Sequence, residues 1–269
     1  MRTLIRFIAA LYLTVLTAIP SAAHEFWIDP HDFSVAPGAP LVADLRVGQD
    51  FEGTALSYIP RNFSRFDLAS GDQTTPVEGR LGDRPALNID GLSEGLAIIL
   101  YETTDSFVSY DDWTRFVGFV EHKDFPDTLA RHAARGLPEV DFTESYTRHV
   151  KSLIAVGRGA GQDRAFGLRT EFVALANPYT DDLSAGFPVQ LLHDGAPRAD
   201  VQVELWDRAP DGTVTVTLHR TDSTGHALLP VASGHVYMVD AVAMLETAPE
   251  APRNAVWHSL WAALTFEVP

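Results

Sequence analysis

The chain has no cysteine, which excludes disulfides, thiolate metal sites and a cysteine nucleophile. It is also poor in basic residues: 20 Lys and Arg stand against 36 Asp and Glu, for a formal charge of −16. Such a surface repels phosphate groups, so nucleic acid is not an expected partner. No H-E-x-x-H pattern of a zinc protease occurs. We therefore expect a non-catalytic globular protein that hydrophobic burial alone stabilises.

The first residues read as a secretory signal rather than as part of the fold. Arg2 and Arg6 give Met1–Ala23 a positive start, Phe7–Ile19 is an apolar run, and Ser21–Ala23 supplies small residues at a cleavage site. The run is too short to span a membrane, and no later run is longer, so we predict a periplasmic protein without an integral membrane segment after cleavage. The alternative is an uncleaved anchor. Cleavage would bring the formal charge from −16 to −18.

Short strands separated by Gly, Pro and Asp turns make up most of the remaining chain. Leu41–Val47, for example, alternates apolar and other residues, as a half-buried strand does. The spacing of these strands is typical of β-sandwiches. We predict a mainly β fold with an N-terminal β-sandwich over residues 24–160. A second, immunoglobulin- or transthyretin-like sandwich is expected over residues 161–269. The expected strands are Leu41–Val47, Phe63–Leu68, Thr75–Glu78, Ala86–Ile89, Leu96–Glu102, Gly186–Leu192, Val201–Trp206, Val214–Leu218, Ala227–Val231, Val236–Val242 and Leu260–Val268.

A helical period interrupts this pattern. Trp113, Phe116 and Val120 share one face of a helix that an aspartate at 111 or 112 would cap. Asp127–Arg135 predicts a second short helix, ended by a glycine. Glu139–Val156 fits a helical stripe or a strand equally well. We place a short helical insertion at about residues 111–150, between the two sandwiches.

Cleavage after Ala23 would make His24 the first residue of the mature chain. An N-terminal histidine offers its α-amine and its ring Nδ1 to one metal ion, and the α-amine loses its proton easily near neutral pH. Amine and imidazole nitrogens suit nickel, cobalt, copper or zinc. A metal site at His24 is therefore a chemical consequence of the predicted cleavage.

Several short motifs occur in a particular order along the mature chain. Their ordered set resembles an exported bacterial family known as domain of unknown function 4198. Some of its members are labelled periplasmic components of nickel or cobalt uptake systems. The resemblance implies an all-β periplasmic protein that handles a transition metal. The motifs that carry it are Ala23–Pro30 (AHEFWIDP), Leu45–Gly48, Gly79–Asp83, Arg135–Pro138, Tyr146–His149, Val156-Gly157, Ala176–Tyr179, Gly195–Pro197, Thr221-Asp222 with Gly225, and Trp257–Phe266.

A useful metal site needs further donors besides His24. His31 lies seven residues on and could fold back to it. His122 and His132 flank a proline break, so two short helices could bring them together. For each of these three, an ordinary position on the protein surface is the alternative interpretation, and the residue types alone favour it.

Three functions follow from these residues. The first is a periplasmic protein that takes up or buffers nickel, cobalt or copper through His24 and serves a transporter in the inner or outer membrane. The second is a non-catalytic interaction module that binds a partner or glycan without a metal. The third is a copper-dependent oxidative enzyme, which would require a second histidine facing His24 in a histidine brace.

Overall fold

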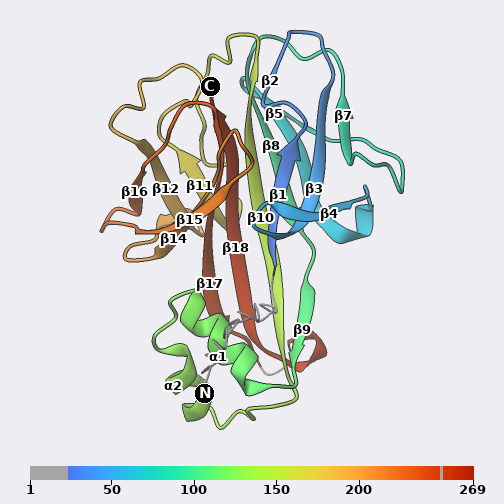
Figure 1. Ribbon diagram of the computed structural model, residues 1–269. Coiled ribbons are helices and arrows are strands. Elements are labelled where there is room, and N and C mark those ends of the chain that lie inside the picture. The colour runs from blue at the N-terminus through green and yellow to red at the C-terminus, as the bar shows by residue number, and fades with distance from the viewer. Residues whose placement is uncertain (1–23, 249–250) are drawn as a thin grey trace, which may run out of the picture.

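The computed structural model describes residues 24–248 and 251–269, so the predicted signal lies outside the described residues. The described chain is mainly β, with several sheets and two α-helices (Figure 1). The predicted mainly β, sandwich-type fold is therefore confirmed.

One ten-stranded sheet forms the centre of the molecule. Its main path runs β15-β14-β17-β18-β10-β8-β5-β6, and β2 and β9 also pair with β10. In chain order these strands are β2 (Ser34–Val35), β5 (Phe63–Ser70), β6 (Gln73–Pro76), β8 (Gly95–Thr103), β9 (Ser106–Tyr110), β10 (Phe142–Val156), β14 (Gln202–Arg208), β15 (Val214–Arg220), β17 (His235–Glu246) and β18 (Ala255–Val268).

Two four-stranded sheets cover this central sheet. The first contains β1 (Glu25–Pro30), β3 (Leu41–Gln49), β4 (Glu52–Leu56) and β7 (Leu87–Ile89). The second contains β11 (Thr170–Ala174), β12 (Phe187–His193), β13 (Ala196–Pro197) and β16 (His226–Leu229). Short 3-10 turns occupy Pro60–Asn62 and Pro252–Asn254.

Strand β8 shows how the two sandwiches share the central sheet. Leu96, Ile98 and Leu100 belong to the apolar core that includes the second small sheet. Ala97, Ile99 and Tyr101 belong to the core beneath β1 and β3. Because successive side chains of a strand point to opposite faces, the central sheet carries one core on each face. Alternate side chains of β8 thus enter two different cores, which the sequence predicts for separate domains.

The predicted boundary near residue 160 does not coincide with a break in this sheet. Strand β10, before the boundary, pairs in parallel with β18, after it, from Thr143 opposite Ala255 to Ser152 opposite Thr265. The two sandwiches are therefore joined by continuous hydrogen bonding through their common sheet.

The helical insertion is shorter than predicted. Only α1 (Trp113–His122) and α2 (Thr128–Ala134) are α-helical among the described residues. Residues 142–156, which fitted either a helix or a strand, form β10. Nearly all of β10 is buried on both faces, which removes the polar alternation that identifies a half-buried strand.

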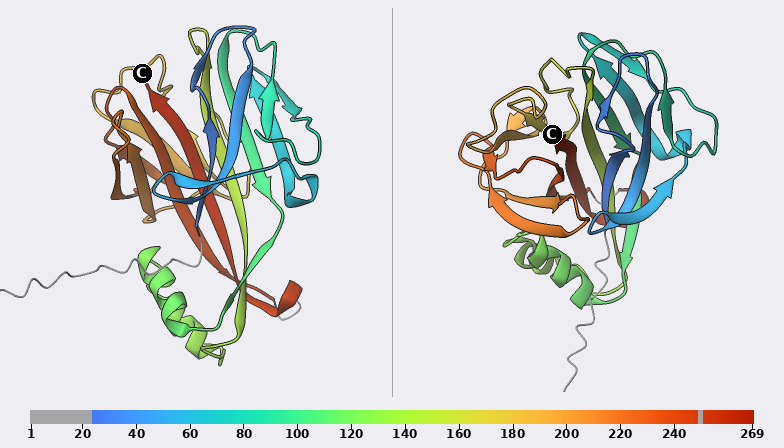
Figure 2. Two further views of the ribbon diagram at one scale, coloured as in Figure 1. Left: turned by 45° about the vertical axis from the view of Figure 1, so that its right-hand side comes forward. Right: turned by 45° about the horizontal axis from the view of Figure 1, so that its top comes forward.

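The two helices lie at one end of the molecule, beside the ends of the long central strands (Figure 2). Asp112 caps α1 by accepting a hydrogen bond from the Thr114 backbone N–H at 2.9 Å, as the sequence predicts. Phe116 and Phe119 pack with Trp257 and Trp261 of β18 in a third apolar core. Within residues 24–248 and 251–269, no helix combines the length and apolar character that crossing a bilayer requires.

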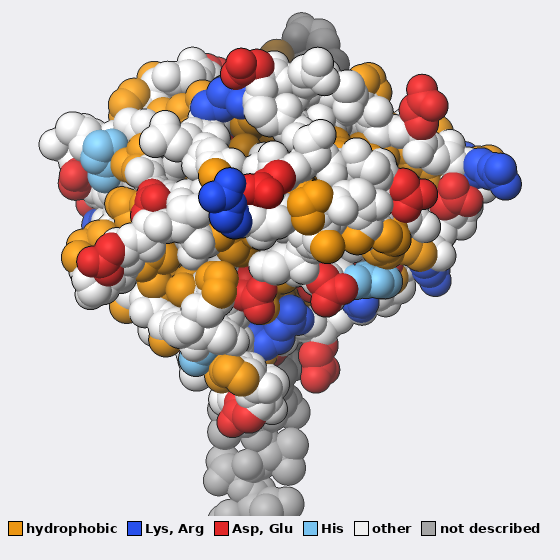
Figure 3. Space-filling view, turned by 90° about the horizontal axis from the view of Figure 1, so that it is seen from above, with side chains coloured by type: hydrophobic (Ala, Val, Ile, Leu, Met, Phe, Trp, Pro, Cys, Tyr) orange, Lys and Arg blue, Asp and Glu red, His pale blue; other side chains and the backbone are white. Residues whose placement is uncertain are grey.

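The opposite end of the molecule is shown in Figure 3. Acidic and basic side chains are interspersed there, with hydrophobic side chains between them. Despite the net acidic charge of the chain, this end is not a surface of a single sign. This end therefore carries no patch of a single sign that would serve as a docking surface for a polyion.

Candidate functional site

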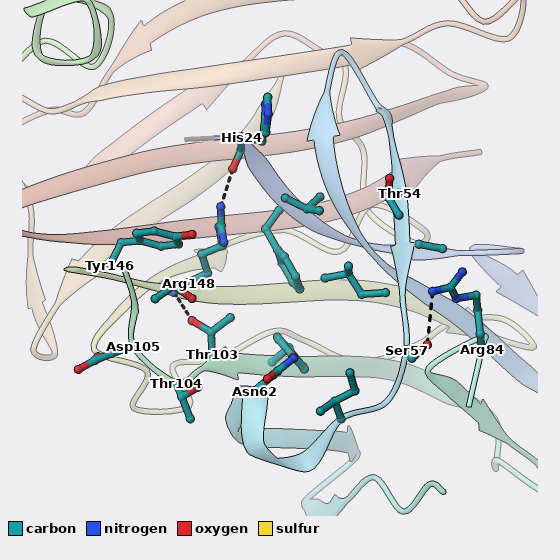
Figure 4. Close-up of a pocket in the computed structure, with 17 residues that line it drawn as sticks. His24, Thr54, Ser57, Asn62, Arg84, Thr103, Thr104, Asp105, Tyr146 and Arg148 are labelled. Carbon is teal, nitrogen blue, oxygen red and sulfur yellow. Dashed lines mark hydrogen bonds between the residues drawn. The ribbon is translucent and has the colours of Figure 1, made fainter. Parts of the chain in front are cut away.

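A cavity of about 530 Å³ opens beside the start of β1. Figure 4 shows residues from β1, β4, β8 and β10 around it. The walls contain aromatic rings and many hydroxyl or amide groups, and His24 lies at the edge where the described chain begins. The lining residues are His24, Phe26, Val47, Thr54, Ala55, Leu56, Ser57, Ile59, Asn62, Arg84, Tyr101, Thr103, Thr104, Asp105, Ser106, Tyr146 and Arg148.

Arg148 of β10 connects this cavity to His24. Its Nη2 donates a hydrogen bond to the His24 carbonyl oxygen at 2.8 Å, drawn as a dashed line in Figure 4. The guanidinium also lies 4.7 Å from the Tyr146 ring centroid and 5.6 Å from that of Phe26, within the range of cation–π attraction. The backbone of residue 24 is therefore held in place while its side chain is exposed.

The Arg148 side chain has unused hydrogen-bonding capacity. The residue is 7% exposed, and its buried Nε has no hydrogen-bond partner among the described residues. Burial lowers the pKa of Arg148 from its usual value. No carboxylate of the described chain forms an ion pair with it within 4 Å. The carboxylates of Asp240 and Glu25 oppose this effect of burial on the pKa of Arg148 but do not cancel it. An anion in the cavity would further stabilise the buried cation.

The cavity differs in charge from the chain as a whole. Arg84 lies on the side away from Arg148, with its Nη2 3.4 Å from Ser57 Oγ (Figure 4). Asp105 is the one carboxylate among the described lining residues. Two arginines thus face one carboxylate, in a chain that carries a formal charge of −16. This excess of positive charge in the cavity favours an anionic or polar ligand.

A buried ionic cluster lies on the other side of β1. It includes Glu25, the residue that follows His24. Lys123, the residue after α1, places its Nζ 2.8 Å from Glu204 Oε2, 3.1 Å from Asp240 Oδ2 and 3.5 Å from Glu25 Oε1. The side chains of Lys123, Glu204 and Asp240 are at most 3% exposed, and that of Glu25 is 6% exposed. We refer to these four residues as the Lys123 cluster.

Three carboxylates outnumber one ammonium in the Lys123 cluster. Burial is the main cause that raises the pKa of Asp240 to about 7, although Lys123 opposes it. Burial likewise raises the pKa of Glu25. The carboxylates hold the pKa of Lys123 above its usual value in spite of its burial. The cluster therefore keeps its lysine charged and retains a proton on a carboxylate up to near neutral pH.

The structure does not bring His132 and His24 together. His132 is 1% exposed. Its Nε2 lies 2.9 Å from the Pro138 carbonyl oxygen, and its Nδ1 accepts a hydrogen bond from Trp257 Nε1 at 3.0 Å. Both ring nitrogens are thus bonded within the protein, which leaves none for a metal in this arrangement.

The other two predicted ligands, His31 and His122, each contact a carboxylate away from the cavity. His31 follows the far end of β1, and a strand rises about 3.3 Å per residue, so roughly 20 Å of chain separates it from His24. Its Nε2 lies 3.5 Å from Asp44 Oδ2. His122 is half exposed at the end of α1, with Nε2 3.4 Å from Glu204 Oε1. His122 thus adjoins the Lys123 cluster rather than the cavity.

No group of three or more His, Cys, Asp or Glu side chains that could hold a metal occurs within residues 24–248 and 251–269. Any metal at His24 would therefore have fewer than three His, Cys, Asp or Glu side chains of the described residues as ligands. One enzyme-like spacing does occur: Gly91–Gly95 reads G-x-S-x-G. It forms a loop between two strands, β7 and β8, and not the strand–turn–helix elbow that exposes a nucleophilic serine.

Sequence reasoning missed the residues that are most unusual in the structure. Glu204 and Asp240 each interrupt an otherwise apolar strand, and that interruption was an available signal of a buried charge with a partner. Lys123 follows an apolar helix, and Arg148 lies within one of the family-like motifs. Their contacts join segments up to 124 residues apart, which no local pattern reveals.

The fold and the site define a mainly β, sandwich-type protein with a polar cavity at the start of its first strand. The sequence matches the family model described as a domain of unknown function (DUF4198) over residues 21–244. The chain belongs to this family. No curated protein matches it, and no solved structure matches it.

Proposed function

We propose that the protein is exported to the periplasm, is cleaved after Ala23, and binds a divalent transition metal through His24. The ion would be nickel, cobalt or copper, held by the α-amine and the ring Nδ1 of the new first residue. The protein would deliver or buffer this ion for a transporter in the inner or outer membrane.

One observation carries the proposal: the buried Arg148 donates a hydrogen bond to the His24 carbonyl. This bond fixes the backbone of the residue that would become the N-terminus and uses neither of its two nitrogens. A fixed chelating residue loses less conformational freedom when it binds a metal than a free chain end does. His24 is also exposed at the edge of a cavity, where a metal and its remaining ligands have room.

The proposal concerns binding rather than oxidative chemistry. A histidine brace would need a second imidazole that faces the first. Among the described residues that line the cavity, His24 is the one histidine. The donor set favours copper over nickel and cobalt in intrinsic affinity, so the ion bound in the cell would depend on geometry and supply.

The test is a metal titration of the chain that begins at His24, released from a cleavable fusion partner. The comparison protein carries one additional residue, Ala23, which converts the α-amine of His24 into an amide. We expect the extension and the His24→Gln variant each to weaken binding of Ni(II) at least tenfold. His31→Gln is the matched control, because this histidine is also exposed but follows the far end of β1. Equal affinity with and without Ala23 would overturn the proposal.

A further inference from the structure

The proposed site is chemically incomplete, and this inference rests on the proposed function. The α-amine and imidazole of His24 supply two donors, whereas nickel and copper in nitrogen and oxygen environments take four to six. The described side chains contain no cluster that would supply the others. Water or a small ligand can fill the remaining positions.

The cavity beside His24 has the size and the chemistry for such a ligand. Its volume of about 530 Å³ lies within the range of sites that bind small molecules. The cations at its walls, Arg84 and Arg148, have no carboxylate partner within 4 Å among the described residues, since their contacts are Ser57 and the His24 carbonyl. Arg148 Nε is buried and has no hydrogen-bond partner within residues 24–248 and 251–269.

A carboxylate is the anion that best suits these groups. A guanidinium presents several N–H donors in a planar fork that matches a carboxylate. Such charge-assisted bonds are stronger at the buried Arg148 than at the exposed Arg84. The Phe26, Tyr101 and Tyr146 rings supply apolar walls for the carbon skeleton of the ligand. Asp105 would repel a second carboxylate nearby but can accept a hydrogen bond from a hydroxyl group.

We infer that the metal is bound as a complex with a small hydroxycarboxylate chelator, whose carboxylates are held by Arg148 and Arg84 while its remaining donors and His24 share the ion. The ligand class of the cavity is thus a metal–carboxylate complex and not a bare ion. The arginines select the chelator, and His24 selects its metal-loaded form.

The test uses Ni(II), citrate and the chain that begins at His24. Radiolabelled citrate is mixed with the protein, with and without one equivalent of Ni(II), and the retained citrate is measured after ultrafiltration. We expect one citrate per chain only when Ni(II) is present. We also expect Arg84→Gln to reduce citrate retention at least tenfold. Titration with Ni(II) alone reports separately on the His24 site.

The controls separate this inference from the proposed function. Arg80→Gln changes an exposed arginine of the same loop that does not line the cavity, and it should retain citrate as the parent does. Thermal melting checks that both variants fold. If Ni(II) binds and citrate only competes with the protein for it, the inference is wrong and the His24 site stands. If neither Ni(II) nor its citrate complex binds, the proposed function fails as well.

Discussion

Replacement of Lys123 by methionine tests the account of the Lys123 cluster. The substitution keeps a long apolar side chain but removes the ammonium that lies 2.8 Å from Glu204 and 3.1 Å from Asp240. Three buried carboxylates are then left without their counter-charge. Removing one partner of a buried ion pair costs about 3–5 kcal/mol. At about 2–4 °C per kcal/mol for a domain of this size, the melting temperature should fall by roughly 6–20 °C.

The loss should depend on pH in a defined direction. The pKa of Asp240 is about 7 in the folded protein and about 3.9 in an unfolded chain. The folded state therefore binds the extra proton between these values, and the free energy of unfolding falls as the pH rises through this window. Without Lys123 the pKa values of the carboxylates rise further. The melting temperature of the variant should therefore be closest to that of the parent near pH 5 and furthest below it near pH 8.

Thermal melting at both pH values measures this difference. His122→Gln is the matched control, because it alters the neighbouring but half-exposed residue and should change stability by less than about 0.5 kcal/mol. Adding Asp240→Asn to Lys123→Met should recover part of the loss, since one buried charge fewer remains. An equal loss at pH 5 and pH 8, or no recovery in the double variant, would refute the electrostatic explanation in favour of simple loss of packing.

Two other predictions concern the end of the molecule near the helices. Burial raises the pKa of Glu144 to about 7, and Tyr110 donates a hydrogen bond to its Oε2 at 2.8 Å. Glutamine matches the protonated form, so Glu144→Gln should remove a fall in melting temperature between about pH 4.3 and pH 7; an unchanged pH profile would contradict the assignment. Asp112→Ala removes the cap of α1 and should cost about 0.5–2 kcal/mol in denaturant unfolding, whereas no loss would show that the cap contributes nothing.

The sequence predicted the strands that are buried on one face and the helices with a clear period. Leu41–Val47 alternates because β3 has partly exposed positions on one side, and α1 has an apolar stripe with a capping aspartate. Strand β10 was ambiguous because both of its faces are buried. Without alternation, a spacing such as Phe142, Tyr146 and Val150 fits a helix as well as a strand.

Long-range pairing was beyond the reach of local patterns. The parallel register of β10 and β18 joins residues more than a hundred positions apart, so the sequence suggested two separate sandwiches where one central sheet serves both. The same limit applied to the site. His24 could be chosen from the chemistry of an N-terminus, but Arg148 contacts it across 124 positions. The chemistry of a residue is local, whereas its partners are set by the topology.

The most direct measurement of the central claim compares the same protein before and after acetylation of its α-amine. The chain contains two lysines, Lys123 and Lys151, whose side chains are 3% and 1% exposed, so mild acetylation of the folded chain that starts at His24 should modify the α-amine alone. We predict that the modified protein, checked by mass spectrometry, loses at least tenfold in affinity for Ni(II) while its melting temperature in metal-free buffer stays the same. Unchanged affinity of the singly acetylated protein would contradict the claim that His24 is the metal ligand.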